Sequence, residues 1–198
     1  MEAVIYLPES RFTSPTHRCP EPGNWTSADD HSTEREVSEL VAGLVRGLQP
    51  DMVIETGAAF GQTTELIGHA LVANEHGWLY SFEPDLDRHA YALGRTIDLP
   101  VGILPVESIG EWEPPGEIGF AFFDSLFDLR VPEFRHYRQW MTDRTIVAFH
   151  DTAPQAGGGQ LGDWYDLATQ IEYELVRGGA IRTISLPTPR GLVIGQVL

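Results

Sequence analysis

Residues 53–63, with the sequence VIETGAAFGQT, constrain the fold of this chain more than any other stretch. The stretch opens as a β-branched apolar run that reaches the acid Glu55, turns through Gly57 and Gly61, and continues as a helical pattern from Thr63. Glycines let the backbone come close to a ligand, and the free N–H groups of a helix N-terminus point toward it. A strand, a glycine turn and a helix in this order are typical of a nucleotide cradle in an α/β protein.

The spacing of the glycines distinguishes this loop from other nucleotide-binding loops. The pattern is E-x-G-x-x-x-G, with Thr56 and Ala58 beside the first glycine. It is not the G-x-G-x-x-G of dinucleotide-binding folds, and no lysine follows it as in a phosphate-binding P-loop. A wider loop after an acidic strand end suits a ligand that carries an amine and a ribose. A glycine-rich turn without a ligand, as in any α/β protein, is the alternative interpretation.

Strand and helix patterns alternate along the rest of the chain. Apolar periodicity predicts a helix at about 33–48, in which Thr33 and Glu36 fit a capping box. We expect strands at 52–56, 78–83, 101–106, 118–124, 145–150, 181–186 and 192–197, and further helices at about 62–73, 85–97, 132–141 and 163–176. This alternation predicts a parallel sheet covered by helices, with an antiparallel strand in the final hairpin. Residues 1–30 are proline-rich and predict an irregular N-terminal arm, packed on the body or closing over the site, ahead of one domain at 31–198.

The charge balance excludes several classes of partner. The formal net charge is −16, and all 13 basic residues are arginines. Nucleic acids and anionic membranes would be repelled. The single cysteine, Cys19, excludes an internal disulfide and a cysteine-based zinc site. The N-terminus has no apolar signal region and no apolar run approaches the ~20 residues of a membrane span, so we expect a cytoplasmic protein.

Acidic residues lie at the carboxyl ends of five consecutive predicted strands: Glu55, Glu83, Glu107, Asp124 and Asp151. Ligands of open α/β sheets bind beyond these ends, so we expect the acids to meet in one crevice. The last two acids follow neighbouring apolar strands, and their carboxylates repel one another unless a cation or a proton lies between them. A divalent ion such as Mg²⁺ suits such a pair and would lower the pKa of a substrate hydroxyl.

The motif at 55–61 resembles motif I of class I S-adenosylmethionine (SAM) dependent methyltransferases. FFDS at 122–125, FHDTAP at 149–154 and LPTPRG at 186–191 resemble a subgroup of small bacterial methyltransferases, similar to the metal-dependent catechol and macrocin O-methyltransferases. The resemblance extends from about residue 32 to the C-terminus. It implies a Rossmann-like seven-stranded sheet of order 3-2-1-4-5-7-6 whose last strand is antiparallel. It also implies O-methylation of a hydroxyl on a small, natural-product-like molecule.

The resemblance implies roles for individual residues. The SAM-binding set would be Glu55, Thr56, Gly57, Ala58, Gly61, Thr63, Glu83, Glu107, Ser108 and Asp124. Within it, Glu83 would accept hydrogen bonds from the ribose diol, or else be a solvated acid before a helix. Glu107 and Ser108 would contact the adenine or form a surface turn, and Glu55 or Asp124 would face the methionine ammonium.

A possible Mg²⁺ site is implied at Asp124, Asp151 and Thr152. Three features depart from the relatives' pattern. Thr152 is a weaker ligand than their asparagine, and no lysine exists to assist deprotonation. The continuation SLFD after Asp124 also replaces their G-D-H, which leaves Asp128 as a substitute ligand or a surface residue.

His150 is the candidate general base, because its ordinary pKa lets it accept a proton near neutral pH. With Asp124 and Asp151 it completes the predicted catalytic set. The alternative is that His150 only orients Asp151. Neighbouring residues of a strand point to opposite faces, so the two side chains need not reach one site.

Aromatic residues and the overall function leave further alternatives. Trp112, Phe127, Trp164 and Tyr165 could line an acceptor pocket, form a homodimer face or belong to the core. The function could also be that of a catalytically silent SAM-binding or scaffold protein. An NAD-linked oxidoreductase is disfavoured by the glycine spacing.

Overall fold

The computed structural model describes residues 10–11, 19, 21–27, 32–153 and 166–198. Its main body is a seven-stranded sheet of order β5-β4-β3-β6-β7-β9-β8. The strands are β3 (Met52–Thr56), β4 (Trp78–Phe82), β5 (Val101–Leu104), β6 (Ile118–Phe123), β7 (Met141–His150), β8 (Ile181–Leu186) and β9 (Leu192–Val197). Counted from β3, this order is 3-2-1-4-5-7-6, which confirms the predicted methyltransferase-like topology.

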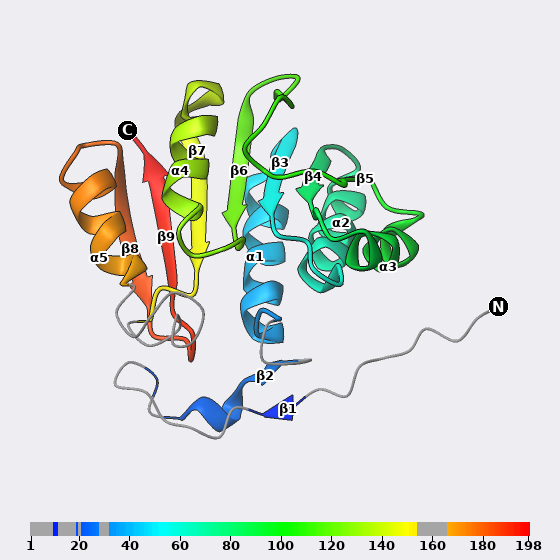
Figure 1. Cartoon of the computed structure of the whole chain (residues 1–198), viewed down its shortest axis with the longest axis horizontal. Coiled ribbons are helices and arrows are strands. Elements are labelled where there is room, and N and C mark those ends of the chain that lie inside the picture. The colour runs from blue at the N-terminus through cyan, green and yellow to red at the C-terminus, as the bar shows by residue number, and fades with distance from the viewer. Residues whose placement is uncertain (1–9, 12–18, 20, 28–31, 154–165) are drawn as a thin grey trace.

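The strands β3 to β7 pair in parallel, and β9 pairs antiparallel with both β7 and β8. In Figure 1 the parallel strands end at the lower edge of the sheet, while β9 runs the other way. Strand order reverses between β3 and β6, which are neighbours in the sheet but are separated in the chain by β4 and β5. That reversal is the point at which open α/β sheets bind ligands.

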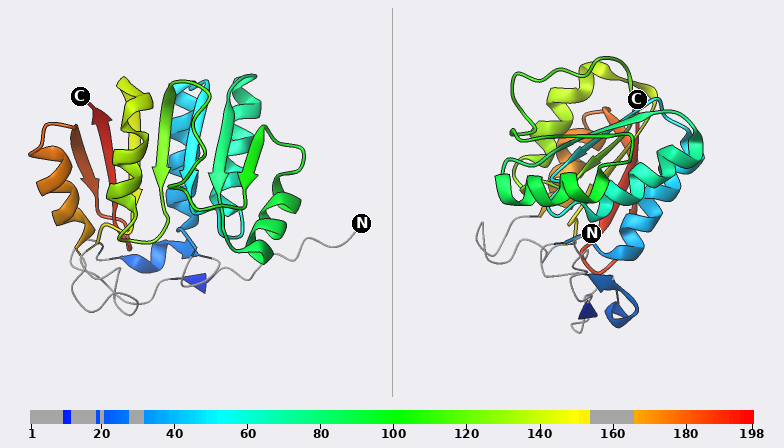
Figure 2. Two further views of the ribbon diagram at one scale, coloured as in Figure 1. Left: turned by 45° about the horizontal axis from the view of Figure 1, so that its top comes forward. Right: turned by 90° about the vertical axis from the view of Figure 1, so that its right-hand side faces the viewer.

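Helices cover both faces of the sheet (Figure 2). They are α1 (Arg35–Leu48), α2 (Gln62–Asn74), α3 (Leu86–Thr96), α4 (Arg130–Tyr137) and α5 (Leu167–Ile171), with 3₁₀ turns η1 (Pro22–Asn24) and η2 (Arg138–Trp140) and a π-helical turn η3 (Glu172–Val176). One apolar cluster joins α1 and α2 to the sheet, and a second joins α4 and α5 to the opposite face. Strand β6 is fully apolar because both of its faces are covered.

Several element boundaries differ from the prediction. Strand β5 ends at Leu104 rather than 106, and β7 begins at Met141 rather than 145. The helix predicted at 132–141 begins at Arg130 and ends at Tyr137, where a 3₁₀ turn continues it. The predicted start of the helix at 163, the glycine run at 157–159 and most of the N-terminal arm lie outside the described residues.

The described part of the N-terminal arm lies beyond the carboxyl ends of the parallel strands (Figure 1). It contains the small hairpin of β1 (Ser10–Arg11) and β2 (Thr26–Ser27). Thr26 donates hydrogen bonds from its backbone N–H and its hydroxyl to Glu36 of α1, at 2.9 and 3.0 Å. The predicted capping box of Thr33 with Glu36 is therefore wrong, because Glu36 binds this hairpin instead and α1 has no side-chain cap. No helix among the described residues is long and apolar enough to cross a membrane.

Candidate functional site

A cavity of about 360 Å³ lies at the carboxyl ends of the parallel strands. Each of the five strands contributes to its wall, through Gly57 after β3, Glu83 after β4, Glu107 and Ser108 after β5, Asp124 after β6 and Asp151 after β7. Arginines line it as well, at positions 88, 130 and 190. Four of the five predicted acids thus share one cavity, at the topological switch point.

Gly57 is the first residue of the loop between β3 and α2 and lines the cavity. Its φ is +86°, and a Cβ at this position would lie 2.6 Å from the carbonyl oxygen of Asp124. The ends of β3 and β6 therefore approach closely at this point, and only glycine fits there. The backbone N–H groups of Gly57 and Ala58 both donate to the carbonyl of Phe82, at 3.1 and 2.9 Å, which ties the loop to β4.

Glu83 fixes the other side of the loop. It is 5% exposed, and its Oε2 accepts a hydrogen bond from the backbone N–H of Ala59 at 2.8 Å. Its Oε1 accepts from the N–H of Asp85 at 3.0 Å, just before α3. A carboxylate has about four lone-pair sites, so these two bonds leave acceptor capacity directed at a ligand. Glu83 is therefore held at the cavity wall by two backbone N–H groups and is not a freely solvated acid.

Ser108 is buried, whereas Glu107 beside it is exposed on the cavity wall. The Ser108 hydroxyl donates to Glu133 of α4, and its carbonyl accepts from the Tyr137 hydroxyl. Glu133 also accepts from the Thr56 hydroxyl, at 2.9 Å. Burial raises the pKa of Glu133, and the hydrogen bonds from Ser108 and Thr56 act against that rise. Glu133 thus joins the ends of β3 and β5 beneath the cavity.

The remaining members of the predicted SAM-binding set lie away from the described cavity wall. Glu55 is 1% exposed, and its carboxylate accepts from Thr64 and Ser81, each at 2.6 Å. Burial raises the pKa of Glu55 to about 7, although both hydrogen bonds oppose the rise. The Thr63 hydroxyl contacts Ser38 of α1 at 2.8 Å. Thr56 binds Glu133, Ala58 packs against Ala92, and the Gly61 N–H donates to the carbonyl of Ala58. Of the two acids predicted to face the ammonium, only Asp124 lines the cavity.

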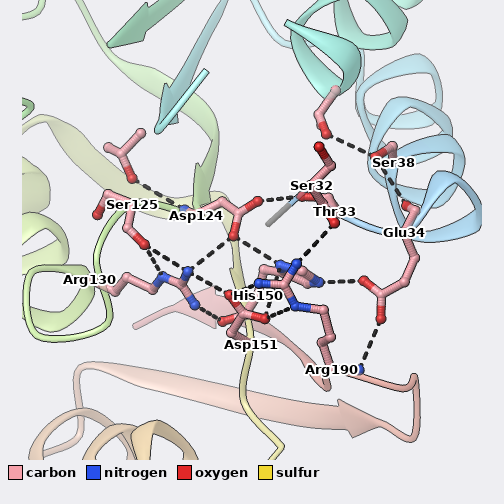
Figure 3. A network of polar contacts seen from close by, with 12 residues as sticks. Ser32, Thr33, Glu34, Ser38, Asp124, Ser125, Arg130, His150, Asp151 and Arg190 are labelled. Atoms are coloured by element: carbon pink, nitrogen blue, oxygen red, sulfur yellow. Dashed lines mark hydrogen bonds and ion pairs between the residues drawn. The ribbon is translucent and has the colours of Figure 1, made fainter. Parts of the chain in front are cut away.

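Asp124 lies at the centre of a charged cluster (Figure 3). Its Oδ1 accepts from His150 Nδ1 at 2.9 Å, and its Oδ2 accepts from the hydroxyl of Thr33, just before α1. His150 is fully buried, and its Nε2 donates to Oε2 of Glu34 at 2.5 Å. Two carboxylates therefore hold opposite nitrogens of one imidazole ring. Since an ionised carboxylate only accepts, both ring nitrogens carry a proton.

This arrangement decides what His150 can do. Burial alone would lower the pKa of His150, but the charges of Asp124, Asp151 and Glu34 raise it to about 10. The charge of His150 in turn holds the pKa of Glu34 below its usual range, against the opposing effect of burial. An imidazolium has no lone pair with which to accept a proton. The structure therefore does not favour the predicted general-base role of His150, whose two ring nitrogens contact the carboxylates of Asp124 and Glu34.

Asp151 binds two arginines (Figure 3). Its Oδ2 accepts from Arg130 Nη2 at 2.9 Å and from Arg190 Nη2 at 2.8 Å, and its Oδ1 pairs with Arg190 Nε. Burial alone would raise the pKa of Asp151, but the charges of His150, Arg190 and Arg130 hold it well below its usual range. Asp151 and His150 both reach one cluster, which settles the question that strand alternation left open.

Two of the three predicted metal ligands, Asp124 and Asp151, already have other partners. Asp124, His150 and Asp151 form a group close enough to surround an ion. However, Nη2 of Arg130 already lies between the two carboxylates, 3.1 Å from Asp124 Oδ1 and 2.9 Å from Asp151 Oδ2. The Thr152 hydroxyl lies beside Gly191, 2.8 Å from where a Cβ of that residue would be, and is not on the described cavity wall. Asp128 is exposed and also off that wall. These residues as arranged do not fit a divalent ion.

Three members of the cluster were missed from the sequence: Glu34, Arg130 and Arg190. They lie before α1, at the start of α4 and in the turn between β8 and β9, so only the tertiary fold brings them together. One feature of the sequence could have pointed to these arginines. The carboxylates of Asp124 and Asp151 repel one another unless a cation lies between them, and the chain has arginines but no lysine to supply one.

The predicted aromatic wall divides between core and cavity. Trp112 packs on Tyr80 and Phe82, with ring centroids 4.9 and 5.2 Å apart, so it belongs to the core. Phe127 lines the cavity and lies under the guanidinium of Arg130, whose carbon is 4.8 Å from the ring centroid. Trp164 and Tyr165 lie outside the described residues.

Comparison with solved structures places the fold among methyltransferases. A putative O-methyltransferase from Klebsiella pneumoniae matches with a TM-score of 0.69 and 17% identity, over 84% of this chain and 82% of its own. An O-methyltransferase of tomaymycin synthesis from Streptomyces achromogenes, solved with SAM, matches with a TM-score of 0.68 and 14% identity over the same shares. An O-methyltransferase from Bacillus cereus, solved with S-adenosylhomocysteine (SAH), matches with a TM-score of 0.71 and 11% identity, over 85% and 83%.

These matches confirm the predicted resemblance at the level of the fold. No protein-family model matches the chain. No curated protein matches its sequence.

Proposed function

We propose that this protein is a SAM-dependent methyltransferase that transfers the methyl group to a hydroxyl oxygen of a small molecule. The observation that carries the proposal is the cavity at the switch point, in which the Gly57 loop, Glu83 and Asp124 face one space of about 360 Å³. A volume of this size suits a nucleoside-sized ligand rather than a polymer. The solved neighbours that contain SAM or SAH share this fold and support the choice of cofactor.

Each part of the cavity has a place in this proposal. Glu83 accepts hydrogen bonds from the ribose diol, and Glu107 with the backbone near Ser108 contacts the adenine. The sulfonium of SAM is a cation, and the cavity lining attracts it because its five acidic residues outnumber its three arginines. The transferred methyl would then lie near Asp124, where the acceptor enters past Phe127.

The chemistry in this proposal is an in-line displacement. The acceptor oxygen attacks the methyl carbon, the carbon–sulfur bond breaks, and the hydroxyl proton leaves to solvent. Because the sulfonium charge disappears during the transfer, the protein acts mainly by aligning the donor, the methyl and the oxygen. No residue is needed as a metal ligand, and the Mg²⁺-assisted form suggested by the sequence is not part of the proposal.

Calorimetry with SAM, SAH and NAD tests the cofactor. We expect SAM and SAH to bind and NAD not to bind. Glu83→Ala should weaken SAM binding by roughly 10- to 100-fold, because a charge-assisted bond to the ribose is lost. Glu111→Ala, which changes an exposed glutamate off the described wall, is the matched control. Binding of NAD in place of SAM would remove the proposal.

Turnover separates the enzyme from a silent SAM-binding protein of the same fold. The alternative is favoured by one observation, that both ring nitrogens of the candidate base His150 are held by the carboxylates of Asp124 and Glu34. Conversion of SAM to SAH should be followed by mass spectrometry with a panel of phenols, catechols and aliphatic alcohols. Acceptor-dependent SAH formation supports the methyltransferase. SAM binding without turnover on any acceptor favours the silent protein.

A further inference from the structure

Arg130 lies where a divalent ion would bridge Asp124 and Asp151. One nitrogen, Nη2, contacts both carboxylates, at 3.1 and 2.9 Å. An ion bound to the same two oxygens would have to displace this nitrogen. Mg²⁺ sits about 2.0–2.1 Å from its oxygen ligands, so the two cations cannot share the position.

Arg130 is fixed there by a set of contacts that have nothing to do with the carboxylates. Its Nε and Nη2 donate to the carbonyl of Ser125 at 3.0 and 2.7 Å, and Nη1 donates to the carbonyl of His150. Its guanidinium covers the ring of Phe127, and its side chain is 2% exposed. Figure 3 shows the guanidinium held between the loop after β6 and the end of β7. A buried guanidinium whose nitrogens all have acceptors and whose face covers an aromatic ring belongs to the interior of the protein. It is not a surface side chain that has turned inward.

Both carboxylates already have cationic partners among the described residues. Asp124 pairs with Arg130, and Asp151 pairs with both Arg130 and Arg190. A divalent ion bound between the two carboxylates would leave the displaced guanidinium of Arg130 buried without its partners, which is costly.

From these contacts we infer that Arg130 is the resident cation of the cavity, and that the protein works without a divalent metal. Arg130 is a positioning residue: it holds Asp124, Asp151 and the carbonyl of Ser125 in the arrangement that shapes the methyl-acceptor side. The statement about catalysis rests on the proposed methyl transfer, whereas the statement about metal binding does not.

Manganese binding measured by electron paramagnetic resonance tests the inference without any need for turnover. The full chain should not bind Mn²⁺ at this site. Arg130→Met removes the cation, keeps much of the apolar stem, and leaves Asp124 and Asp151 facing each other. It should bind Mn²⁺ at least roughly 100-fold more tightly than the unaltered protein, because a like charge next to the ion is gone.

Matched variants locate the effect. Arg130→Met combined with Asp151→Asn should lose the gained Mn²⁺ binding. Arg130→Lys keeps the charge and should not gain it. Arg135→Met, on the same helix with a side chain 58% exposed, should behave as the unaltered protein.

Each outcome decides the inference. Mn²⁺ binding by the unaltered protein that Asp151→Asn abolishes would overturn it. So would an Arg130→Met variant that is folded by circular dichroism and gains no Mn²⁺. If Arg130→Met is unfolded, the refolding of that variant on adding Mn²⁺ supports the inference, and its failure to refold counts against it.

Where turnover is found, chelation by EDTA should leave the rate of the unaltered protein unchanged. A rate that collapses with EDTA and returns with Mg²⁺ would overturn only the statement that catalysis works without a divalent metal.

Discussion

His150 and Asp151 are consecutive residues, and both side chains enter the same charged cluster because Asp151 adopts a φ of 57° where β7 ends. A continued strand would point them to opposite faces. A left-handed turn at Asp151 changes the direction of the chain, and aspartate is among the few residues that tolerate it. Strain of this kind is typical of functional sites, where surrounding contacts hold it in place.

Replacing His150 should destabilise the fold strongly. His150→Gln removes the cation between Glu34 and Asp124, and leaving buried carboxylates without it should cost about 3–5 kcal/mol. Urea unfolding at pH 7 measures this loss. His69→Gln, at an exposed position of α2, is the control and should change stability by less than about 0.5 kcal/mol.

The same histidine predicts a pH dependence. The pKa of His150 is raised to about 10, above its ordinary 6.5. A raised pKa contributes stability that is fully present below pH 6.5 and is lost as the pH rises through 10. Urea midpoints of the unaltered protein should therefore fall between these values, and those of His150→Gln should fall less. Parallel curves for the two proteins would contradict the assignment of His150 as a cation.

Glu55 should produce a second pH effect, in a lower range. Its pKa is raised from 4.5 to about 7, so the folded state binds a proton that the unfolded chain has released. Stability from this group is present below pH 4.5 and is lost as the pH rises through about 7. Glu55→Gln keeps an acceptor for Thr64 and Ser81 but cannot ionise. It should be more stable than the unaltered protein at pH 8, by up to about 3 kcal/mol.

Gly57 should tolerate no side chain. Gly57→Ala places a Cβ 2.6 Å from the carbonyl oxygen of Asp124 at a φ of +86°. We expect a loss of more than about 2 kcal/mol of stability, and a decrease in SAM affinity of more than tenfold, because the loop must move. Gly47→Ala is the matched control, since no atom lies within 4 Å of its Cβ on α1. It should be neutral or stabilising by up to about 1 kcal/mol. Calorimetry and thermal unfolding measure both.

Glu133 should act on cofactor affinity from beneath the cavity. Glu133→Ala removes the acceptor shared by Thr56 and Ser108, and the unsatisfied hydroxyls should cost about 1–3 kcal/mol of stability. SAM affinity should fall, because the strand ends that carry Gly57 and Ser108 lose their connection. Glu133→Gln retains one acceptor oxygen and should recover most of the affinity. Equal losses in the two variants would show that charge, not hydrogen bonding, matters here.

Sequence patterns predict the strand order and the position of the cavity well, because both follow from short stretches of sequence. Apolar runs locate the strands, the glycine loop marks the switch point, and the acids at the strand ends converge as parallel topology requires. Glu55 is the exception. Being one residue before the end of β3, it faces Thr64 and Ser81 rather than the cavity.

The cluster itself could not be predicted in this way. Thr33 and Glu36 have the spacing of a helix cap. However, Thr33 binds Asp124, far along the chain, and Glu36 binds Thr26 in the N-terminal arm. Glu34 and Arg130 have no local signature, because Glu34 binds His150, 116 residues away, and Arg130 binds Asp151, 21 residues away. A metal was a sound expectation for two facing carboxylates, and the cation in the structure is an arginine from α4.

Arg190, in the turn between β8 and β9, also has a consequence for biosynthesis. It pairs with Asp151, 39 residues earlier, and its backbone N–H binds Glu34, 156 residues earlier. On the ribosome, a nascent chain that has not yet reached this turn holds both carboxylates without that partner. Completion of the cavity therefore requires this hairpin, and a chain released before Arg190 is made would keep Asp151 and Glu34 without this partner.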